Sequence, residues 1–355
     1  MNILELRNIT KKFPGSWLPA VDNLNLDVAM SENVALLGES GCGKTTILRM
    51  IAGFEVPDGG TIKINGQVVS GQGKFIEPQN RKVGIVFQDY ALFPHKTVWE
   101  NIIFGLFRLP ESEVNKKASE IIELTGLQGL EKRYPHQLSG GQKQRVALAR
   151  AMAPEPELIL FDEPFSNIDS MRKQQMREDI KNIIKKTRAT AIFVTHDTKD
   201  VMSIADKVSV IRQGRIVQTD NPQKIYTFPV NTYVADFFGK TNYIKAKVSP
   251  EGYKTAMGII KTKSPLPADI KDVLLSIRPE EFTTCKEKND CFYGSIVKER
   301  FMGEYKELTC KVENPSGENT EIIIYTIPNA QCTNGKCYFK PNEEKIHVLK
   351  KHDEY

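Results

Sequence analysis

The chain has 355 residues, a length that favours two domains over one compact core. Its apolar content of 40% is ordinary for a globular protein, and its net charge of +5 comes from 49 basic and 44 acidic side chains that are not gathered into blocks. This composition argues against a nucleic-acid partner, and no apolar stretch approaches the ~18–20 residues that a membrane-spanning helix needs.

Two features of the sequence bear on the cellular compartment. The segment Met1–Arg7 lacks the basic-then-apolar pattern of a secretory signal peptide, so we expect the protein to stay in the cytosol. The six cysteines are scattered, which fits a reducing compartment. Cys332 and Cys337 flank a Thr-Asn-Gly-Lys turn, and a disulfide or a metal site remains open for this pair.

Up to about residue 238, segments typical of strands and helices alternate. Short apolar runs predict buried strands at 34–37, 83–87, 158–161 and 191–194. Residues 62–68 contain the Asn-Gly pair of a tight hairpin. Apolar side chains recur at helical spacing in 114–122 and 176–184. This alternation predicts an α/β fold around a largely parallel sheet.

A glycine-rich loop follows the first of these strands. Its glycines let backbone N–H groups approach phosphates, and a helix that starts near Lys44 adds its positive N-terminal end. We expect Lys44 to lie between the β- and γ-phosphates of a nucleotide and the Thr45 hydroxyl to bind Mg²⁺. The Gly-x4-Gly-Lys-Thr pattern predicts contacts from Gly38, Ser40, Gly41, Cys42, Gly43, Lys44, Thr45 and Thr46.

An acidic pair ends another apolar strand. Asp162 and Glu163 follow Leu158–Phe161, and Pro164 stops the strand. We expect Asp162 to hold Mg²⁺, directly or through water, and Glu163 to act on the attacking water as general base or as positioning group. Together with the phosphate loop, the pair favours a catalytic role over a solvated turn.

The pentapeptide Leu138–Gln142 opens another predicted helix. Ser139 and Gln142 fit a capping box, which explains these two residues structurally. Two glycines just inside a helix each cost ~0.5–1 kcal/mol in propensity, and they are expected where backbone approaches an anion. Because Lys44 already serves the chain's own nucleotide, we expect a partner's γ-phosphate to be bound by Ser139, Gly140, Gly141 and Gln142.

Three further positions complete the predicted site. Gln88, after the 83–87 strand, is expected to contact Mg²⁺ or the attacking water, and His196 to hydrogen-bond the γ-phosphate. Phe13, or alternatively Trp17, is expected to stack on adenine. Catalytic roles thus fall to Lys44, Gln88, Glu163 and His196, and Mg²⁺ ligation to Thr45, Gln88 and Asp162.

In their order along the chain, these motifs resemble the nucleotide-binding subunit of ATP-binding-cassette (ABC) transporters. The resemblance covers residues 1 to about 238 and includes Arg145–Ala151, between the pentapeptide and the acidic pair. One departure is mild, because Ser166-Asn167-Ile168-Asp169 stands where the family usually has Ser-Ala-Leu-Asp. Ser166 and Asp169, the polar contacts expected across a dimer, remain. The intact Glu163 implies hydrolysis rather than binding alone.

The resemblance also implies a fold and an assembly. Residues 1–238 would form an ABC ATPase of the P-loop NTPase class with a helical subdomain. Two copies would bind head to tail, each ATP lying between the Lys44 loop of one and the Ser139 helix of the other. The loop Phe87–His95 is similar to the loop that receives a helix of the membrane permease. Its apolar side chains would be either buried core or an exposed docking patch, namely Tyr90, Leu92 and Phe93.

Residues 239–355 have a different character. Gly, Pro and Asn separate short strand-like runs at 243–248, 273–277, 321–325 and 345–349, which predict a small all-β domain, a barrel or a sandwich. Ser276–Glu280 and Gly294–Val297 resemble the oligonucleotide/oligosaccharide-binding (OB) type of accessory domain in bacterial importers. In that setting we expect a dimer-stabilising or regulatory role.

The function that these observations favour is ATP-driven import at the cytoplasmic face of the inner membrane. The implied partners are ATP, Mg²⁺, a second copy, two permease subunits and a periplasmic or lipid-anchored binding protein. Residues 73–84 and 89–95 look most like ferric-iron importers, with polyamine and sulfate importers as alternatives. The competing classes are a soluble ABC ATPase, which usually carries two cassettes or a coiled-coil insertion, and a stand-alone binding module, which has no need of Glu163.

Overall fold

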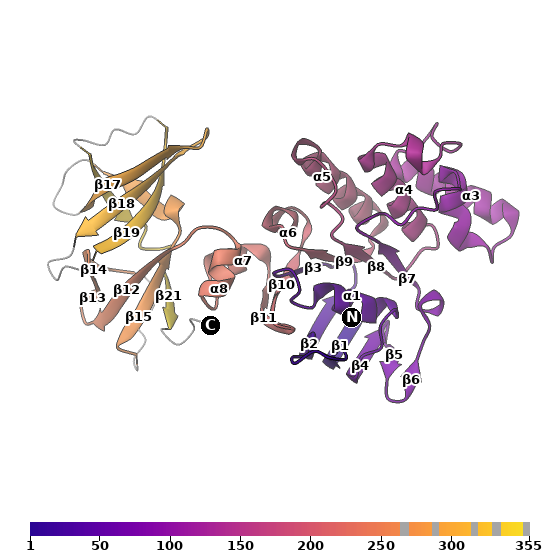
Figure 1. Ribbon diagram of the computed structural model, residues 1–355, viewed down its shortest axis with the longest axis horizontal. Coiled ribbons are helices and arrows are strands. Elements are labelled where there is room, and N and C mark those ends of the chain that lie inside the picture. Colours follow the sequence, from indigo (N-terminus) through magenta and orange to yellow (C-terminus); the bar gives the residue numbers. More distant parts are fainter. Residues whose placement is uncertain (263–269, 286–290, 314–318, 329–334, 351–355) are drawn as a thin grey trace. The chain divides into compact units, whose positions relative to one another are not determined.

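The computed structural model describes residues 1–262, 270–285, 291–313, 319–328 and 335–350. They form two compact units, Met1–Gln223 and Lys224–Tyr355, shown as ribbons in Figure 1. The sequence analysis places the domain boundary after residue 238. In the structure, most of α7 (Pro222–Thr227) and all of α8 (Thr232–Phe237) belong to the second unit. Buried Arg278 contacts both helices, because it donates to the Ala235 carbonyl of α8 at 3.0 Å and to the Tyr226 carbonyl of α7 at 3.4 Å.

The first unit is built on a six-stranded sheet. Its strand order is β11 (Arg215–Asp220), β10 (Lys207–Arg212), β3 (Asn33–Leu37), β9 (Thr190–Thr195), β8 (Leu158–Asp162) and β7 (Val83–Val86). The five strands from β10 to β7 are parallel, and β11 is an antiparallel edge. This confirms the predicted strands and the largely parallel sheet. The central strands are mainly apolar and buried because both faces of the sheet are covered.

A second, antiparallel sheet and α1 (Lys44–Ala52) cover one face of the core sheet (Figure 1). Its order is β2 (Val21–Ala29), β1 (Asn2–Lys11), β4 (Gly59–Ile64), β5 (Gln67–Gly71) and β6 (Lys74–Phe75). The predicted hairpin is confirmed, with Asn65 and Gly66 between β4 and β5. Side chains of both sheets share one apolar core with the buried face of α1, which consists of Ile47, Leu48, Met50, Ile51 and Ala52.

Helices cover the opposite face of the core sheet. The two predicted helices are confirmed as α3 (Glu111–Thr125) and α5 (Ser170–Thr187). The others on this face are α2 (Val98–Ile103), α4 (Gly140–Met152), α6 (Thr198–Ile204) and the 3-10 turns Phe104–Leu106 and Pro135–Gln137. A further 3-10 turn, Pro78–Asn80, precedes Arg81, which donates to the Met50 carbonyl of α1 at 2.7 Å. Their apolar side chains enclose Phe161 and Phe193, whose stacked ring centroids lie 4.4 Å apart. Helices α2, α3 and α4 form the expected helical subdomain.

The second unit is β-rich, which confirms the predicted accessory domain. One sheet has the order β14 (Gly258–Ile260), β13 (Gly252–Thr255), β12 (Asn242–Ser249), β15 (Asp272–Ile277) and β21 (His347–Lys350). The other, beside the 3-10 turn Pro279–Glu281, has β16 (Phe282–Thr284), β20 (Lys336–Pro341), β17 (Phe292–Phe301), β18 (Lys306–Glu313) and β19 (Asn319–Thr326). The sheets share one core, and the Asn242 side chain bonds the Ile323 backbone at 2.7 and 2.8 Å.

One pair of cysteines departs from the expectation of isolated thiols. Cys285, after β16, and Cys291, before β17, form a disulfide. Both strands pair with β20, so their ends come together, and this proximity has no signal in the sequence. Cys332 lies outside the described residues, so its relation to Cys337 stays open. Within the described ranges, no group of three or more His, Cys, Asp or Glu side chains is placed to hold a metal ion.

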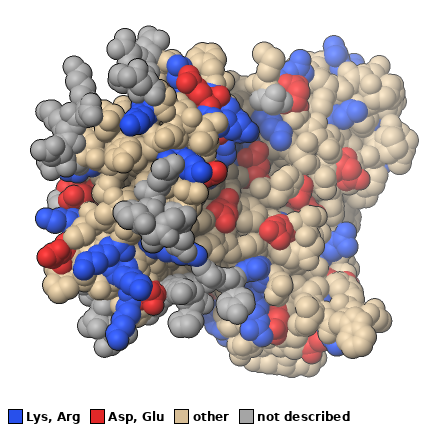
Figure 2. Space-filling view, turned by 60° about the vertical axis from the view of Figure 1, so that its left-hand side comes forward, with Lys and Arg blue, Asp and Glu red and all other residues tan. Residues whose placement is uncertain are grey.

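Charged side chains of both signs occur together on the surface. On the face presented in Figure 2, Lys and Arg are interspersed with Asp and Glu. This mixture agrees with a net charge of only +5 from 93 charged side chains, 49 basic plus 44 acidic. Across the described part of the chain, no helix is both long and apolar enough to span a membrane.

Candidate nucleotide-binding site

Four segments that carry predicted site residues meet at one edge of the core sheet. The phosphate loop follows β3, Gln88 follows β7, Glu163 follows β8 and His196 follows β9. Parallel strands end at the same edge, so segments far apart in the sequence lie side by side there (Figure 1). The edge of the sheet, rather than any single motif, therefore assembles the candidate site.

The glycines of the phosphate loop are required for two physical reasons. Gly41 and Gly43 have φ values of 81° and 105°, which other residues rarely adopt. A Cβ at Gly43 would also lie 2.2 Å from the Ala20 carbonyl oxygen, and a Cβ at Gly38 would lie 2.4 Å from the Ile211 carbonyl oxygen. The conformation of the loop thus depends both on its own turns and on close packing against the backbone at Ala20 and Ile211.

Lys44 lies inside the loop that it closes. Its side chain is buried, and Nζ donates to the carbonyl oxygens of Gly38 and Glu39, both at 2.7 Å. The buried Sγ of Cys42 lies 3.6 Å from the same nitrogen, so Cys42 offers a ligand its backbone rather than its side chain. The ammonium is held over the centre of the loop, where a phosphate group would be neutralised by it and by the N-terminus of α1.

Thr45 and Asp162 form the predicted metal-binding pair. The Thr45 hydroxyl donates to Asp162 Oδ1 at 3.2 Å, although 117 residues separate them. Burial raises the pKa of the Asp162 carboxyl, with Glu163 adding to the rise, while the bond from Thr45 opposes it. A hard cation would favour the charged carboxylate, and carboxylate and hydroxyl oxygens are its preferred ligands. The residues present therefore fit Mg²⁺.

Glu163 and His196 are brought into direct contact. Glu163 Oε1 lies 3.2 Å from His196 Nδ1. The Glu163 backbone has φ 45°, an unusual value for a non-glycine residue, and its amide donates to the Val194 carbonyl at 2.9 Å. A backbone held in this region points to a functional constraint, because strain persists only where the surroundings enforce it.

The pentapeptide begins α4 as the sequence predicts. Ser139 is the N-cap, and the capping box is complete, with the Ser139 amide donating to Gln142 Oε1 at 2.9 Å and the Gln142 amide donating to Ser139 Oγ at 3.4 Å. A Cβ at Gly140 would meet only the Tyr90 hydroxyl, at 3.8 Å. Packing within the chain therefore does not require glycine at that position, which is consistent with the expected approach of a phosphate.

The remaining predicted residues are accessible. Gln88 is exposed, and its carbonyl accepts a hydrogen bond from the Asn167 side chain at 2.8 Å. Phe13 is 38% exposed and Trp17 is 95% exposed, so both rings are free to meet a base, and the choice between them stays a prediction. Of the docking loop, Tyr90 is buried, while Leu92 and Phe93 are half-buried.

Sequence reasoning missed a buried charged network behind His196. Arg177 of α5 donates to Asp200 of α6 at 2.7 Å and to Asp197 at 3.1 Å. Asp200 accepts from the Thr195 hydroxyl at 2.7 Å, and that hydroxyl accepts from the Asp197 amide at 3.0 Å. The network brackets the histidine on both sides. Its only signal in the sequence is a set of charges on helical segments, which is the ordinary pattern of a solvated face.

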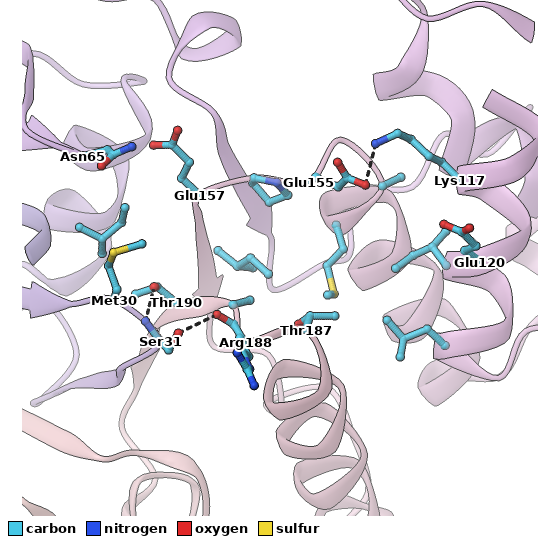
Figure 3. Close-up of a pocket in the computed structure, with 18 residues that line it drawn as sticks. Met30, Ser31, Asn65, Lys117, Glu120, Glu155, Glu157, Thr187, Arg188 and Thr190 are labelled. Carbon is cyan, nitrogen blue, oxygen red and sulfur yellow. Dashed lines mark hydrogen bonds and ion pairs between the residues drawn. The ribbon is translucent and has the colours of Figure 1, made fainter. Parts of the chain in front are cut away.

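A cavity of about 430 Å³ lies at the other edge of the core sheet, near the starts of β8 and β9. Figure 3 shows Lys117 reaching from α3 toward Glu155, and Ser31 beside Thr190 and Arg188. No residue predicted for the nucleotide site lines it. The cavity is therefore separate from the chemistry at the carboxyl ends of the strands.

Comparison with known proteins identifies the family. Residues 21–166 match the sequence profile described as "ABC transporter". The chain is 37% identical to the spermidine/putrescine import ATP-binding protein PotA of Nitrosospira multiformis, over 99% of this chain and 98% of that protein. The chain belongs to the ABC transporter family. It is an ATP-hydrolysing, energy-coupling subunit of the importer type, as the resemblance implied.

Other ABC importer subunits and solved ABC cassettes show the same similarity. The Fe(3+) ions import ATP-binding protein FbpC of Photorhabdus laumondii is 38% identical, covering 87% of each chain. The cbiO1 structure from Clostridium perfringens, described as part of the ABC transporter complex cbiONQ, is 30% identical with a TM-score of 0.59, covering 63% of this chain and 90% of that one. The cassette MJ0796, dimeric and bound to ADP and Pi, is 29% identical with a TM-score of 0.55, covering 62% and 98%.

Proposed function

We propose that this ABC ATPase powers the import of a cationic cargo, either ferric iron or a polyamine. Residues 73–84 and 89–95 favour iron, and the relatives carry names of both kinds at nearly equal identity, 38% for an iron importer and 37% for a polyamine importer. Sulfate is the third alternative named for the resemblance, and the relatives compared above carry names of the first two kinds. Ferric iron and polyamines are both positively charged, so we propose a cationic cargo without choosing between them.

The observation that carries the ATPase mechanism is the contact between Glu163 and His196 beside the phosphate loop. Glu163, at the end of β8, orients the attacking water and accepts its proton. His196 holds the γ-phosphate on one side and Glu163 on the other, so that it registers whether the phosphate is present. Lys44 neutralises the phosphate charge that grows during transfer.

We assign Mg²⁺ binding to Thr45, Asp162 and Gln88. When bound, the ion supplies charge neutralisation between the β- and γ-phosphates. Thr45 and Asp162 are already in contact at 3.2 Å, so this half of the site is preorganised. Gln88 is exposed on its loop, and it would become the third Mg²⁺ ligand when that loop approaches the nucleotide.

The active unit that we propose is a head-to-tail dimer. The phosphate loop and Glu163 of one copy face the N-terminus of α4 of the other, where Ser139 and the glycines offer backbone N–H groups to the γ-phosphate. Closure of the dimer then requires ATP, and the dimer opens after hydrolysis. The differential affinity of ATP for closed and open dimers is what allows the nucleotide to do work.

The dimer would be bound to two permease subunits at the cytoplasmic face of the inner membrane. The half-buried Phe93 ring lies 4.4 Å from the ring of Phe104, and Phe104 and Phe107 are 51% and 76% exposed. Exposed aromatic side chains beside the loop predicted for docking support a surface for an apolar helix. The sequence predicts a docking patch of Tyr90, Leu92 and Phe93, whereas the more exposed aromatic rings are Phe104 and Phe107 on the following segment.

The test is ATP hydrolysis in a complex reconstituted with candidate permease subunits and candidate binding proteins. Iron-, polyamine- and sulfate-loaded binding proteins would each be compared with unloaded ones. Stimulation by iron or by polyamine supports the proposal and selects the cargo. Stimulation by sulfate alone would overturn the cationic cargo, and hydrolysis that no permease affects would point to a soluble ABC ATPase instead.

A further inference from the structure

The segment that follows Glu163 is tied to the segment that contains Gln88. Asn167 Nδ2 donates to the Gln88 carbonyl oxygen at 2.8 Å, across 79 residues of sequence. Asn167 is also one of the two residues, with Ile168, at which this chain departs from the Ser-Ala-Leu-Asp pattern. An alanine at this position has no donor, so the bond depends on that departure.

Both ends of this tie are close to predicted catalytic groups. Ser166 Oγ donates to the Glu163 carbonyl at 2.9 Å, which holds the turn that places the carboxylate. From the other side, Nε2 of the fully buried Gln144 donates to the Pro164 carbonyl at 2.6 Å. The segment 163–167 is therefore anchored to α4, and Asn167 extends this anchored segment to Gln88.

The Gln88 segment needs such support. Tyr90 and Ala91 have φ values of 65° and 45°, which cost free energy for residues other than glycine unless neighbouring groups hold them. Arg150 of α4 donates to the carbonyls of Tyr90 and Ala91 at 3.0 and 2.6 Å. Asn167 supplies the corresponding bond at the start of the segment, where the Gln88 side chain leaves the backbone.

We propose that Asn167 is a positioning residue that holds Gln88 in register with Glu163. In the proposed function, on which this inference rests, Gln88 binds Mg²⁺ and Glu163 acts on the attacking water, so both residues serve the same reaction. A small displacement of one relative to the other would slow the chemical step more than it weakens ATP binding, because the nucleotide phosphates are held by the separate phosphate loop around Lys44.

The test compares Asn167→Leu and Asn167→Asp, which lack a donor, with Asn167→Gln, which keeps one. Asn167 is exposed, so these variants are expected to fold. We expect kcat to fall about three- to tenfold in the first two, with KM for ATP changed less than about twofold, and to recover in Asn167→Gln. The matched control is Asn25→Leu, which removes an exposed asparagine bonded to the Asn23 carbonyl on the antiparallel sheet.

A second readout does not depend on turnover. Amide hydrogen exchange of residues 83–93 in the nucleotide-free protein should accelerate in Asn167→Leu and remain as in the wild type in Asn25→Leu. Unchanged exchange together with unchanged kcat would overturn the inference, and so would equal losses of kcat and ATP affinity. Failure of the proposed function would give a different result. The wild type would then show no ATP hydrolysis, or hydrolysis that Glu163→Gln does not abolish.

Discussion

The imidazole Nδ1 of His196 lies 3.2 Å from the Glu163 carboxylate, although 33 residues separate the two in sequence. Glu163 and His196 directly follow the neighbouring strands β8 and β9, and the strained turn at Glu163 directs its side chain toward the end of β9. A carboxylate and a histidine in contact at the carboxyl edge of a parallel sheet form a ready acid–base pair. The pair lies beside the loop that holds Lys44, so the chemistry that it supports is nucleotide hydrolysis.

Glu163→Gln is expected to abolish turnover while preserving ATP binding. Glutamine keeps the size and the acceptor oxygen but cannot take a proton, so kcat should fall by about 10²–10⁴. Phosphate release measures the rate, and size-exclusion chromatography with ATP should show a stalled dimer. Turnover at the wild-type rate would remove Glu163 from the catalytic role.

Ser139→Ala is expected to abolish hydrolysis and leave the affinity of the isolated monomer for ATP nearly unchanged. Ser139 is far along the chain from the phosphate loop and is proposed to serve the partner's nucleotide. Equilibrium binding to the monomer and phosphate release by the dimer are the two measurements. If the monomer itself lost affinity for ATP, the arrangement in trans would be wrong.

Loss of the helix cap is a separate effect of that substitution, and it has a matched control. Thr97 caps α2 with the same kind of capping box, closed by Glu100. Replacement of either cap by alanine should cost about 0.5–2 kcal/mol of stability. Thr97→Ala should therefore lower the unfolding temperature similarly while retaining the hydrolysis that Ser139→Ala loses.

The ion pair behind His196 should be sensitive to the loss of one partner. Arg177 and Asp200 are 7% and 6% exposed, so Arg177→Met leaves a buried carboxylate without its cation, at a cost of about 3–5 kcal/mol. Adding Asp200→Leu removes that charge too and should recover much of the stability. Thermal unfolding of the single and double variants provides the comparison. Equal unfolding temperatures for Arg177→Met and for the double variant would refute the energetic coupling between Arg177 and Asp200.

The second unit should lose stability in mild acid because of His347. Burial lowers its pKa below the ordinary value of 6.5, although the bond between Nε2 and the Pro229 carbonyl at 2.9 Å opposes the shift. The unfolded chain therefore binds the proton more readily than the folded one. The contribution is present above pH 6.5 and is lost as pH falls through the lowered folded pKa.

Hydrogen exchange of β15 and β21 at pH 7.5 and about pH 5 measures this loss. His347→Gln keeps a donor for the Pro229 carbonyl and should flatten the pH dependence. The exposed His95→Gln serves as control and should leave it as in the wild type. A pH dependence that survives in His347→Gln would assign the effect to another group.

Some parts of the site could be predicted because their chemistry is local. The glycines of the phosphate loop, Lys44 and Thr45 lie in one short segment. Asp162 and Glu163 directly follow a short apolar strand, so this pattern can also be recognised from adjacent residues. The same holds for the capping box at Ser139, whose two bonds span only three residues. Alternation of apolar strands and helices likewise predicted the parallel sheet, and short strand-like runs separated by Gly, Pro and Asn predicted the β-rich accessory domain.

The amino-acid sequence by itself thus determined the nucleotide chemistry and the family, since each motif carries its meaning within a few residues. Tertiary structure alone decided that Glu163 meets His196, that Arg177 meets Asp200, that Asn167 reaches Gln88 and that Cys285 bonds Cys291. The physical reason is strand order. Which side chains share an edge depends on how strands pair across the sheet, and no local periodicity records that pairing.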